Sequence, residues 1–188
     1  MMPLLPRNLM RATGKSTTIF FNFLTAAFLC LPAVAAATDT RLVRVDGVEQ
    51  SMSNYIGRGR WVVVNVWSPS CTFCVQELPH VERFSREHSD VTVLGITLDY
   101  PSFGYGKIDL IRAFLARHPL DYPIFLADIE QASEVIDNRL VGIPLIAIFH
   151  PDGEVLARWP GNIDVREIED FMQNYEAYTP ETSDIGYE

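Results

Sequence analysis

Residues 61–79 of the chain, WVVVNVWSPSCTFCVQELP, contain the pattern that decides the fold. Except for Asn65, the first seven are valine and tryptophan, which is the length and composition of a buried central strand. After the polar loop Ser68–Ser70 a helical pattern begins, in which one face is shared by Val75, Leu78, Val81 and Phe84. Cys71 and Cys74 therefore lie where a central strand passes into a helix.

This junction favours a reactive thiol at Cys71. Free backbone N–H groups and the helix dipole stabilise an anion at a helix N-terminus, which lowers a thiol pKa from ~8.5 toward neutrality. The two intervening residues place Cys74 one helical turn further on, so that it can close a disulfide after a mixed disulfide has formed at Cys71. The spacing thus predicts Cys71 as the attacking thiolate and Cys74 as the resolving, more buried thiol.

Other uses of a C-x-x-C motif agree less well with this sequence. A structural disulfide across so short a loop would constrain the unfolded chain little. A zinc site would need two more ligands, and only His80 and His88 follow on the same helix. Covalent haem attachment would need a histidine directly after Cys74, where the chain has Val75. A peroxiredoxin signature would have proline at the position of Val64.

The first 37 residues have the three parts of a secretory signal peptide. They contain Arg7, Arg11 and Lys15 and no acidic residue, then an apolar run from Ile19, and they end on the small-residue series Ala35–Ala37. We expect cleavage after this series. The alternative is an uncleaved membrane anchor, since the apolar run nearly reaches the ~20 residues that span a bilayer. In both cases the remainder is exported, and we expect it in the bacterial periplasm or on the extracytoplasmic side of the membrane.

Removal of this segment changes both the charge and the cysteine count. Three of the 15 Lys and Arg residues lie in it and none of the 24 Asp and Glu residues, so residues 38–188 have a net charge of −12, against −9 for the whole chain. So acidic a domain lacks the basic surface that nucleic-acid binding requires. The third cysteine, Cys30, belongs to the segment, so the exported part contains only Cys71 and Cys74.

The rest of the exported part alternates strands with helices. Strand patterns occupy residues 41–45, 91–97 and 123–128, and a hairpin pattern occupies 144–159. Helical patterns occupy residues 108–115, 130–136 and 164–175. The last of these has a capping-box-like start at Asp164 and Glu167. Strands that alternate with helices give parallel pairs, and the late hairpin adds an antiparallel edge. We therefore expect one α/β domain over residues 38–178, with a mixed central sheet and helices on both faces, followed by a flexible acidic tail over 179–188.

Residues 61–79 resemble the active-site segment of the thioredoxin superfamily, in particular its exported TlpA/ResA/DsbE-like branch. Trp67 matches the aromatic residue that precedes the motif, and Asn65 stands where cytosolic members have a buried aspartate. Glu77 matches the acidic residue of that branch, three positions after the second cysteine. A second stretch, GIPLIAIFHPDGEV at 142–155, resembles the strand and hairpin that carry the family's cis-proline, here Pro144. The resemblance covers about residues 40–175.

The resemblance implies a thioredoxin fold with an N-terminal β extension and a central βα insertion around residues 100–136. It implies that a cis bond before Pro144 leaves the Ile143 backbone free to pair with an extended substrate segment, and that Trp67 contributes to the substrate site. Glu77 would be a half-buried carboxylate near both sulfurs, which raises the thiol pKa and relays a proton to or from Cys74.

The sequence therefore predicts an exported protein thiol–disulfide oxidoreductase. By resemblance it would reduce cysteines of a partner protein, such as apocytochrome c or another metalloprotein, with electrons from a membrane thiol–disulfide carrier. We expect no metal and no cofactor besides the Cys71–Cys74 disulfide. One alternative is a disulfide oxidase or isomerase of the same fold, because the intervening pair Thr72-Phe73 does not give the direction of electron flow. The other is a Sco-like copper-handling module that would add a distant histidine such as His150.

Overall fold

The computed structural model describes residues 40–175, so the predicted signal segment and the whole of the predicted acidic tail lie outside the described part. Its elements are, in chain order, β1 (Arg41–Arg44), β2 (Glu49–Ser51), the 3-10 helix η1 (Met52–Asn54), β3 (Val62–Trp67), α1 (Thr72–Glu87), β4 (Thr92–Asp99), β5 (Gly104–Tyr105), α2 (Ile108–Leu115), β6 (Ile124–Leu126), α3 (Ile129–Val135), β7 (Leu145–Phe149), β8 (Val155–Pro160) and α4 (Val165–Gln173).

The strands form one mixed sheet in the order β2-β1-β6-β4-β3-β7-β8, with β5 paired to β4 outside this path. β3 pairs in parallel with β4 and antiparallel with β7, and β4 pairs in parallel with β6. All six residues of β3 are buried, as its valine-rich sequence predicts. The carboxyl end of this central strand leads directly to the two cysteines. The predicted fold class is confirmed.

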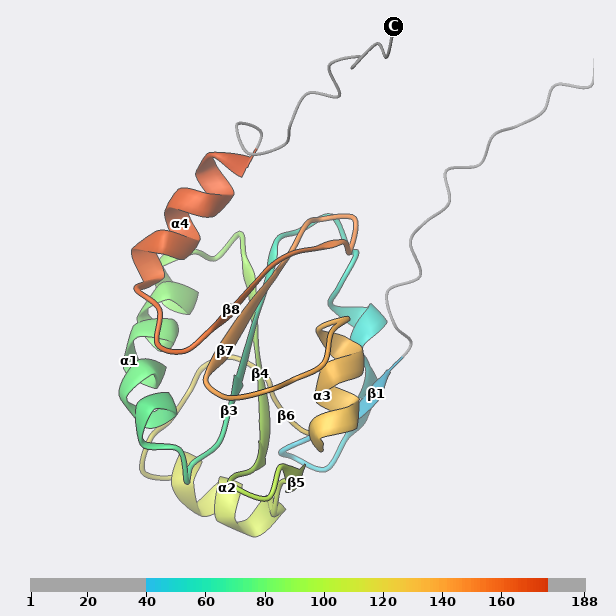
Figure 1. Ribbon diagram of the computed structural model, residues 1–188, viewed down its shortest axis with the longest axis vertical. Helices are drawn as coiled ribbons and strands as arrows, with labels where there is room; N and C mark the ends of the chain where they lie inside the picture. Colours follow the sequence, from blue (N-terminus) through green and yellow to red (C-terminus); the bar gives the residue numbers. More distant parts are fainter. Residues whose placement is uncertain (1–39, 176–188) are drawn as a thin grey trace, which may run out of the picture. The chain divides into compact units, whose positions relative to one another are not determined.

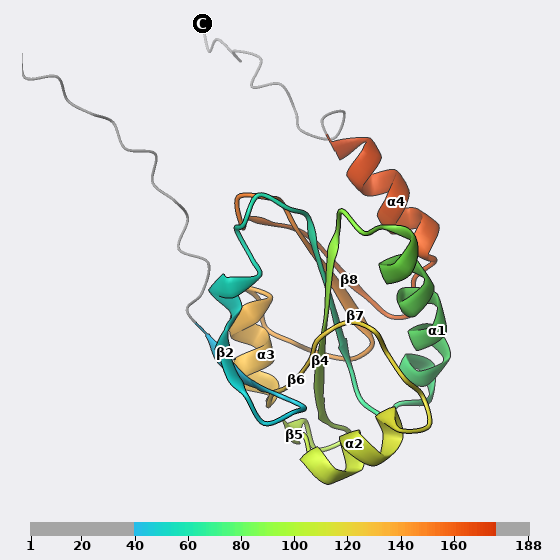
Figure 2. The same cartoon turned by 180° about the vertical axis from the view of Figure 1, so that it is seen from behind.

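Helices cover both faces of the sheet, and β3 sends alternate side chains to each. Val62, Val64 and Val66 belong to the core under α3, whereas Val63 and Trp67 belong to the core under α1, α2 and α4. Figure 1 shows α1 and α4 on one side of the sheet and α3 on the other, and Figure 2 shows the same arrangement from behind. The face under α1 is the one that contains both cysteines.

Two strands are not predicted by the sequence pattern. β2 has the polar sequence EQS and exists because it pairs antiparallel with β1. β5 has two residues inside a glycine-flanked loop and pairs with the end of β4. Neither segment has an alternating pattern of its own, so only the neighbouring strand gives it an extended conformation. Together β5, α2, β6 and α3 fill the stretch 100–136, where the resemblance implies an insertion.

The start of α4 differs from the prediction. Asp164 caps the helix through the N–H of Arg166, 3.0 Å away, and within the described residues Glu167 does not return the second bond of a capping box. The reciprocal pair of bonds occurs instead at α3, between Asp128 and Gln131. Between residues 40 and 175, no helix has both the length and the apolar character needed to cross a bilayer.

Candidate active site

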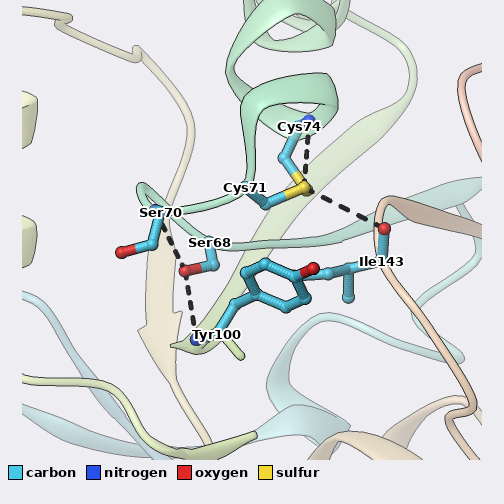
Figure 3. Close-up of a disulfide and its surroundings, with 6 residues drawn as sticks. All are labelled: Ser68, Ser70, Cys71, Cys74, Tyr100 and Ile143. Carbon is cyan, nitrogen blue, oxygen red and sulfur yellow. Dashed lines mark hydrogen bonds between the residues drawn. A yellow bond between two sulfur atoms is a disulfide. The ribbon is translucent and has the colours of Figure 1, made fainter. Parts of the chain in front are cut away.

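Cys71 occupies the N-cap position of α1, immediately after the loop that leaves β3. Its backbone is extended (φ −97°, ψ 109°), and the N–H of Cys74 donates to its Sγ at 3.2 Å. The sulfur thus takes the place that a serine or aspartate oxygen usually has at a helix start. Figure 3 shows this bond at the first turn of α1. The N–H groups and the dipole of a 16-residue helix therefore stabilise negative charge on Cys71 when the disulfide is open.

The two cysteines form a disulfide, with 5.2 Å between their Cα atoms. Cys71 keeps 5% of its surface exposed and Cys74 none. A partner sulfur can therefore approach Cys71 more easily than Cys74, which agrees with the order of attack that the motif predicts.

A second segment lies against this disulfide from 72 positions further along the chain. The Ile143–Pro144 peptide bond is cis, and the carbonyl oxygen of Ile143 lies 3.9 Å from Sγ of Cys71 (Figure 3). A disulfide sulfur has no proton to donate, so in this form the approach is a contact and not a hydrogen bond. Within residues 40–175 Ile143 makes no backbone–backbone hydrogen bond, whereas the carbonyl of Pro144 accepts one from Gly161 at 2.8 Å. The Ile143 backbone therefore remains available to an extended segment.

Glu77 follows Cys74 by one turn on the inner side of α1 and has no exposed surface. It is thus more deeply buried than the half-buried carboxylate that the sequence predicts. Its Oε1 accepts a hydrogen bond from the N–H of Ile163 at 3.1 Å. Burial disfavours the charged form and raises the pKa of Glu77 from 4.5 to about 7, while the hydrogen bond from Ile163 opposes this effect. The carboxyl therefore changes its charge near neutral pH.

Trp67 ends β3 with its side chain fully buried. Its ring packs against Phe114 of α2, with 5.3 Å between the ring centroids. The residue therefore presents no surface to a partner, and its effect on the site passes through the side chains packed around it. Asn65, two residues earlier on the same face, is also fully buried.

The structure adds residues that the sequence analysis does not single out. Ser68 is buried, and its Oγ accepts from the N–H of Ser70 at 3.3 Å and from that of Tyr100 at 3.4 Å, which ties the loop before Cys71 to the end of β4 (Figure 3). Phe73 and Val141 expose 66% and 75% of their surface. A serine beside a proline in a loop is a recognisable turn signal, but nothing local marks Phe73 or Val141 as exposed.

The histidines considered at the sequence level have structural contacts. Nδ1 of His150 lies 2.9 Å from Oδ1 of Asp152, and its ring packs edge-on against Trp61. Nδ1 of His80 lies 3.4 Å from Nη2 of Arg83, and Nε2 of His88 lies 3.0 Å from Oε1 of Glu169. Among the described residues no three His, Cys, Asp or Glu side chains gather in a way that could hold a metal ion. A copper site built from both cysteines and His150 therefore has no preformed ligand set in this part of the chain.

Comparison with known proteins gives one family. A family model described as AhpC/TSA family matches residues 34–158, more than half of the chain. The thiol-disulfide oxidoreductase ResA of Halalkalibacterium halodurans is 25% identical over 118 residues, which cover 61% of this chain and 62% of ResA. The thioredoxin-like protein YneN of Bacillus subtilis is 24% identical over 133 residues, which cover 71% of this chain and 74% of YneN. The match thus spans less than two thirds of the length of ResA.

Solved structures show the same architecture. The pneumococcal exposed lipoprotein thioredoxin Etrx1 of Streptococcus pneumoniae superposes with a TM-score of 0.60 at 19% identity, over 71% of this chain and 97% of that one. At this level of identity the likeness concerns the fold alone, and it confirms the predicted thioredoxin fold.

Proposed function

Because the chain belongs to the AhpC/TSA family, we propose that it is an exported thiol–disulfide oxidoreductase that reduces disulfides of partner proteins. The observation that carries this proposal is the disulfide between Cys71 and Cys74 at the start of α1, beside the cis Ile143–Pro144 bond. The relative named thiol-disulfide oxidoreductase supports it.

The reaction uses the two sulfurs in order. The Cys71 thiolate attacks one sulfur of the partner disulfide, forms a mixed disulfide and releases the other partner sulfur as a thiolate, which then takes up a proton. Cys74 loses its proton to Glu77 and attacks Sγ of Cys71, which releases the second partner sulfur as a thiolate. Two electrons pass to the partner, and the Cys71–Cys74 disulfide forms. A membrane thiol–disulfide carrier then reduces the pair by the same exchange in reverse.

A partner would meet an apolar surface around Cys71. Phe73 stands between the two cysteines, and Val141 precedes the Ile143–Pro144 bond by two residues; both are exposed. Tyr100, also exposed, follows β4, and its N–H donates to Oγ of Ser68 in the loop before Cys71 (Figure 3). An extended segment with an apolar residue near its cysteine could pair with the Ile143 backbone and cover these side chains. The net charge of −12 over residues 38–188 favours a basic partner by electrostatic steering.

A trapping experiment tests the roles of the two cysteines. The full chain is expressed with Cys74→Ser or Cys71→Ser, and proteins joined by disulfides are separated without reductant. We expect mixed disulfides with Cys74→Ser, because Cys71 attacks and nothing resolves the product, and none with Cys71→Ser. Equal trapping by both variants, or by neither, would contradict the proposal.

The reduction potential of the pair separates the proposed reductant from an oxidase or isomerase. Equilibration of the purified protein against glutathione buffers gives this potential. We expect a value toward the thioredoxin end of the superfamily's range, about −270 mV, and not toward the strongly oxidising end, about −120 mV. A value near the oxidising end would show that electrons flow from the partner to the pair.

A further inference from the structure

Five side chains on the α1 side of the sheet bury polar atoms for which the described residues offer no hydrogen-bond partner. They are Asn65, Trp67 through Nε1, Glu77 through Oε2, Thr97 and Tyr122 through its hydroxyl. Oε1 of Glu82 also makes no hydrogen bond, but it has an ion pair with Arg86. Buried polar groups normally have a protein or water partner. Five in one core therefore indicate that ordered water bridges some of them, since a buried water needs two to four such partners.

Gly95 of β4 brings two of these groups together. A Cβ atom at Gly95 would lie 3.2 Å from Nε1 of Trp67, 3.2 Å from Cε2 of Tyr122 and only 2.5 Å from Cδ1 of Ile124. The missing side chain thus leaves room over the strand for the indole N–H, the tyrosine ring and Ile124. Asn65 is the cross-strand neighbour of Gly95 on the same face. Trp67, Tyr122 and Asn65 therefore lie around Gly95 on the same face of the sheet.

Two carboxyl groups of α1 lie within electrostatic reach of Tyr122. Burial raises the pKa of Tyr122 far above its usual value of 10, and the charges of Glu82 and Glu77 raise it further. Oε2 of Glu82 accepts from the N–H of Asp121, next to Tyr122, at 2.9 Å. The phenol therefore stays neutral, and it can donate its proton and accept another without becoming charged.

Glu82 connects this region with solvent. Its other oxygen forms an ion pair with Arg86 at 2.7 Å. It also lines a groove of about 370 Å³ between α1 and α2, together with Arg86, Arg117, His118 and several apolar side chains. Arg86 also pairs with Asp121 at the rim. Glu77 has no such exit, because its side chain is fully buried.

We propose that Tyr122 and ordered water connect Glu77 with Glu82, so that the proton taken from Cys74 leaves through the groove between α1 and α2. This inference rests on the proposed function. The exit is useful because a partner bound at Cys71 covers the redox face at the moment when Cys74 must lose its proton. Glu77 passes the proton to water, the Tyr122 hydroxyl accepts one from water and donates its own onward, and Glu82 releases a proton to the groove. No electron moves along this route, and Tyr122 ends as it began.

The test measures how fast Cys74 resolves a mixed disulfide. The full-length protein is used with Cys30→Ser, so that Cys71 and Cys74 are its only thiols when it is reduced. Ellman's reagent leaves thionitrobenzoate on Cys71, and the second coloured thiolate appears when Cys74 displaces it. We expect Tyr122→Phe and Glu82→Gln to slow this second phase about tenfold and to increase its solvent deuterium isotope effect. The matched controls are Tyr55→Phe, which removes a hydroxyl beside the core on the opposite face of the sheet, and Glu87→Gln at the exposed end of α1.

Both controls should keep the wild-type rate and isotope effect. Wild-type rates and isotope effects in Tyr122→Phe and Glu82→Gln would overturn the inference while leaving the proposed function intact. Failure of the wild-type protein to release a second thiolate would instead reject the proposed function. A loss of thermal stability in either variant with an unchanged isotope effect would assign Tyr122 and Glu82 a structural role only, which also overturns the inference.

Discussion

Glu77 is the residue whose charge the fold controls most directly. Its carboxyl has no contact with solvent, and burial raises its pKa from 4.5 to about 7 despite the hydrogen bond from Ile163. The raised pKa means that the folded protein holds a proton on Glu77 at pH values where the unfolded chain has lost it. The contribution of this proton to the free energy of unfolding is therefore fully present below pH 4.5, and it is lost as the pH rises through about 7.

This linkage predicts the effect of Glu77→Gln on stability. A shift of this size implies that the free energy of unfolding of the wild type falls by up to about 3 kcal/mol as the pH rises from 4.5 to about 7. The amide cannot ionise, so the variant should not show this fall. Urea unfolding of the oxidised protein at a series of pH values measures how the free energy of unfolding depends on pH. Glu87→Gln, on the exposed part of the same helix, should follow the wild type. Parallel pH profiles for Glu77→Gln and the wild type would show that burial of Glu77 does not shift its pKa.

Among the elements, β3, β4 and α1 together build the region behind the disulfide. β3 and β4 pair in register from Val62↔Thr92 to Trp67↔Thr97, and α1 covers them with Cys74, Leu78 and Val81. The packing of Trp67 and Tyr122 over Gly95 of β4 depends on the absence of a side chain at that position.

Gly95→Ala should therefore destabilise the protein by about 1–3 kcal/mol, because the added methyl group overpacks the core against Ile124, Trp67 and Tyr122. Denaturant unfolding gives the free energy, and tryptophan fluorescence should report the displaced ring of Trp67. Gly142→Ala is the matched control, since a Cβ there meets no atom within 4 Å. Equal stability of the two variants would mean that this part of the core adapts without cost.

At the scale of the whole molecule, the surface around Cys71 is assembled from segments that are distant in sequence. Phe73 comes from α1, Tyr100 follows β4, and Val141 precedes β7; all three are exposed hydrophobic residues. Isolated exposed apolar residues are common, but several beside one reactive disulfide suggest a contact surface.

Phe73→Ser combined with Val141→Ser should lower the kcat/KM for a protein disulfide about tenfold or more, because each exposed side chain that a partner buries contributes roughly 1–2 kcal/mol. The reaction with dithiothreitol, which needs no such surface, should change little. Val48→Ser is the control, because Val48 is exposed next to β2 at the far edge of the sheet. A parallel loss with dithiothreitol would indicate damage to the disulfide itself and not to a contact surface.

Local patterns account for the features that the sequence predicts correctly. The valine-rich run 62–67 forms the central strand, and the C-x-x-C motif after it begins a helix, because strand propensity and the helix N-terminus depend on adjacent residues. The cis bond before Pro144 agrees with the family resemblance of its segment. The family resemblance, and not helical spacing, placed Glu77 near the two sulfurs, and it did not give the extent of its burial.

Tertiary packing decides the rest. Which elements meet decides how deeply Glu77 is buried and that Phe114 covers Trp67. It also decides that Ile143 contacts Cys71 across 72 positions of the chain. Tyr122 and Glu82 have no local signal at all, since a tyrosine before a strand and a glutamate in a helix are ordinary residues until other elements cover them. The sequence by itself therefore determined the α/β class, through periodicity, and the position of the cysteine pair at a helix start, and its resemblance to the thioredoxin superfamily gave the fold. Only the structure decided which carboxyl and hydroxyl groups lose water, because desolvation is a property of the packed core and not of any one segment.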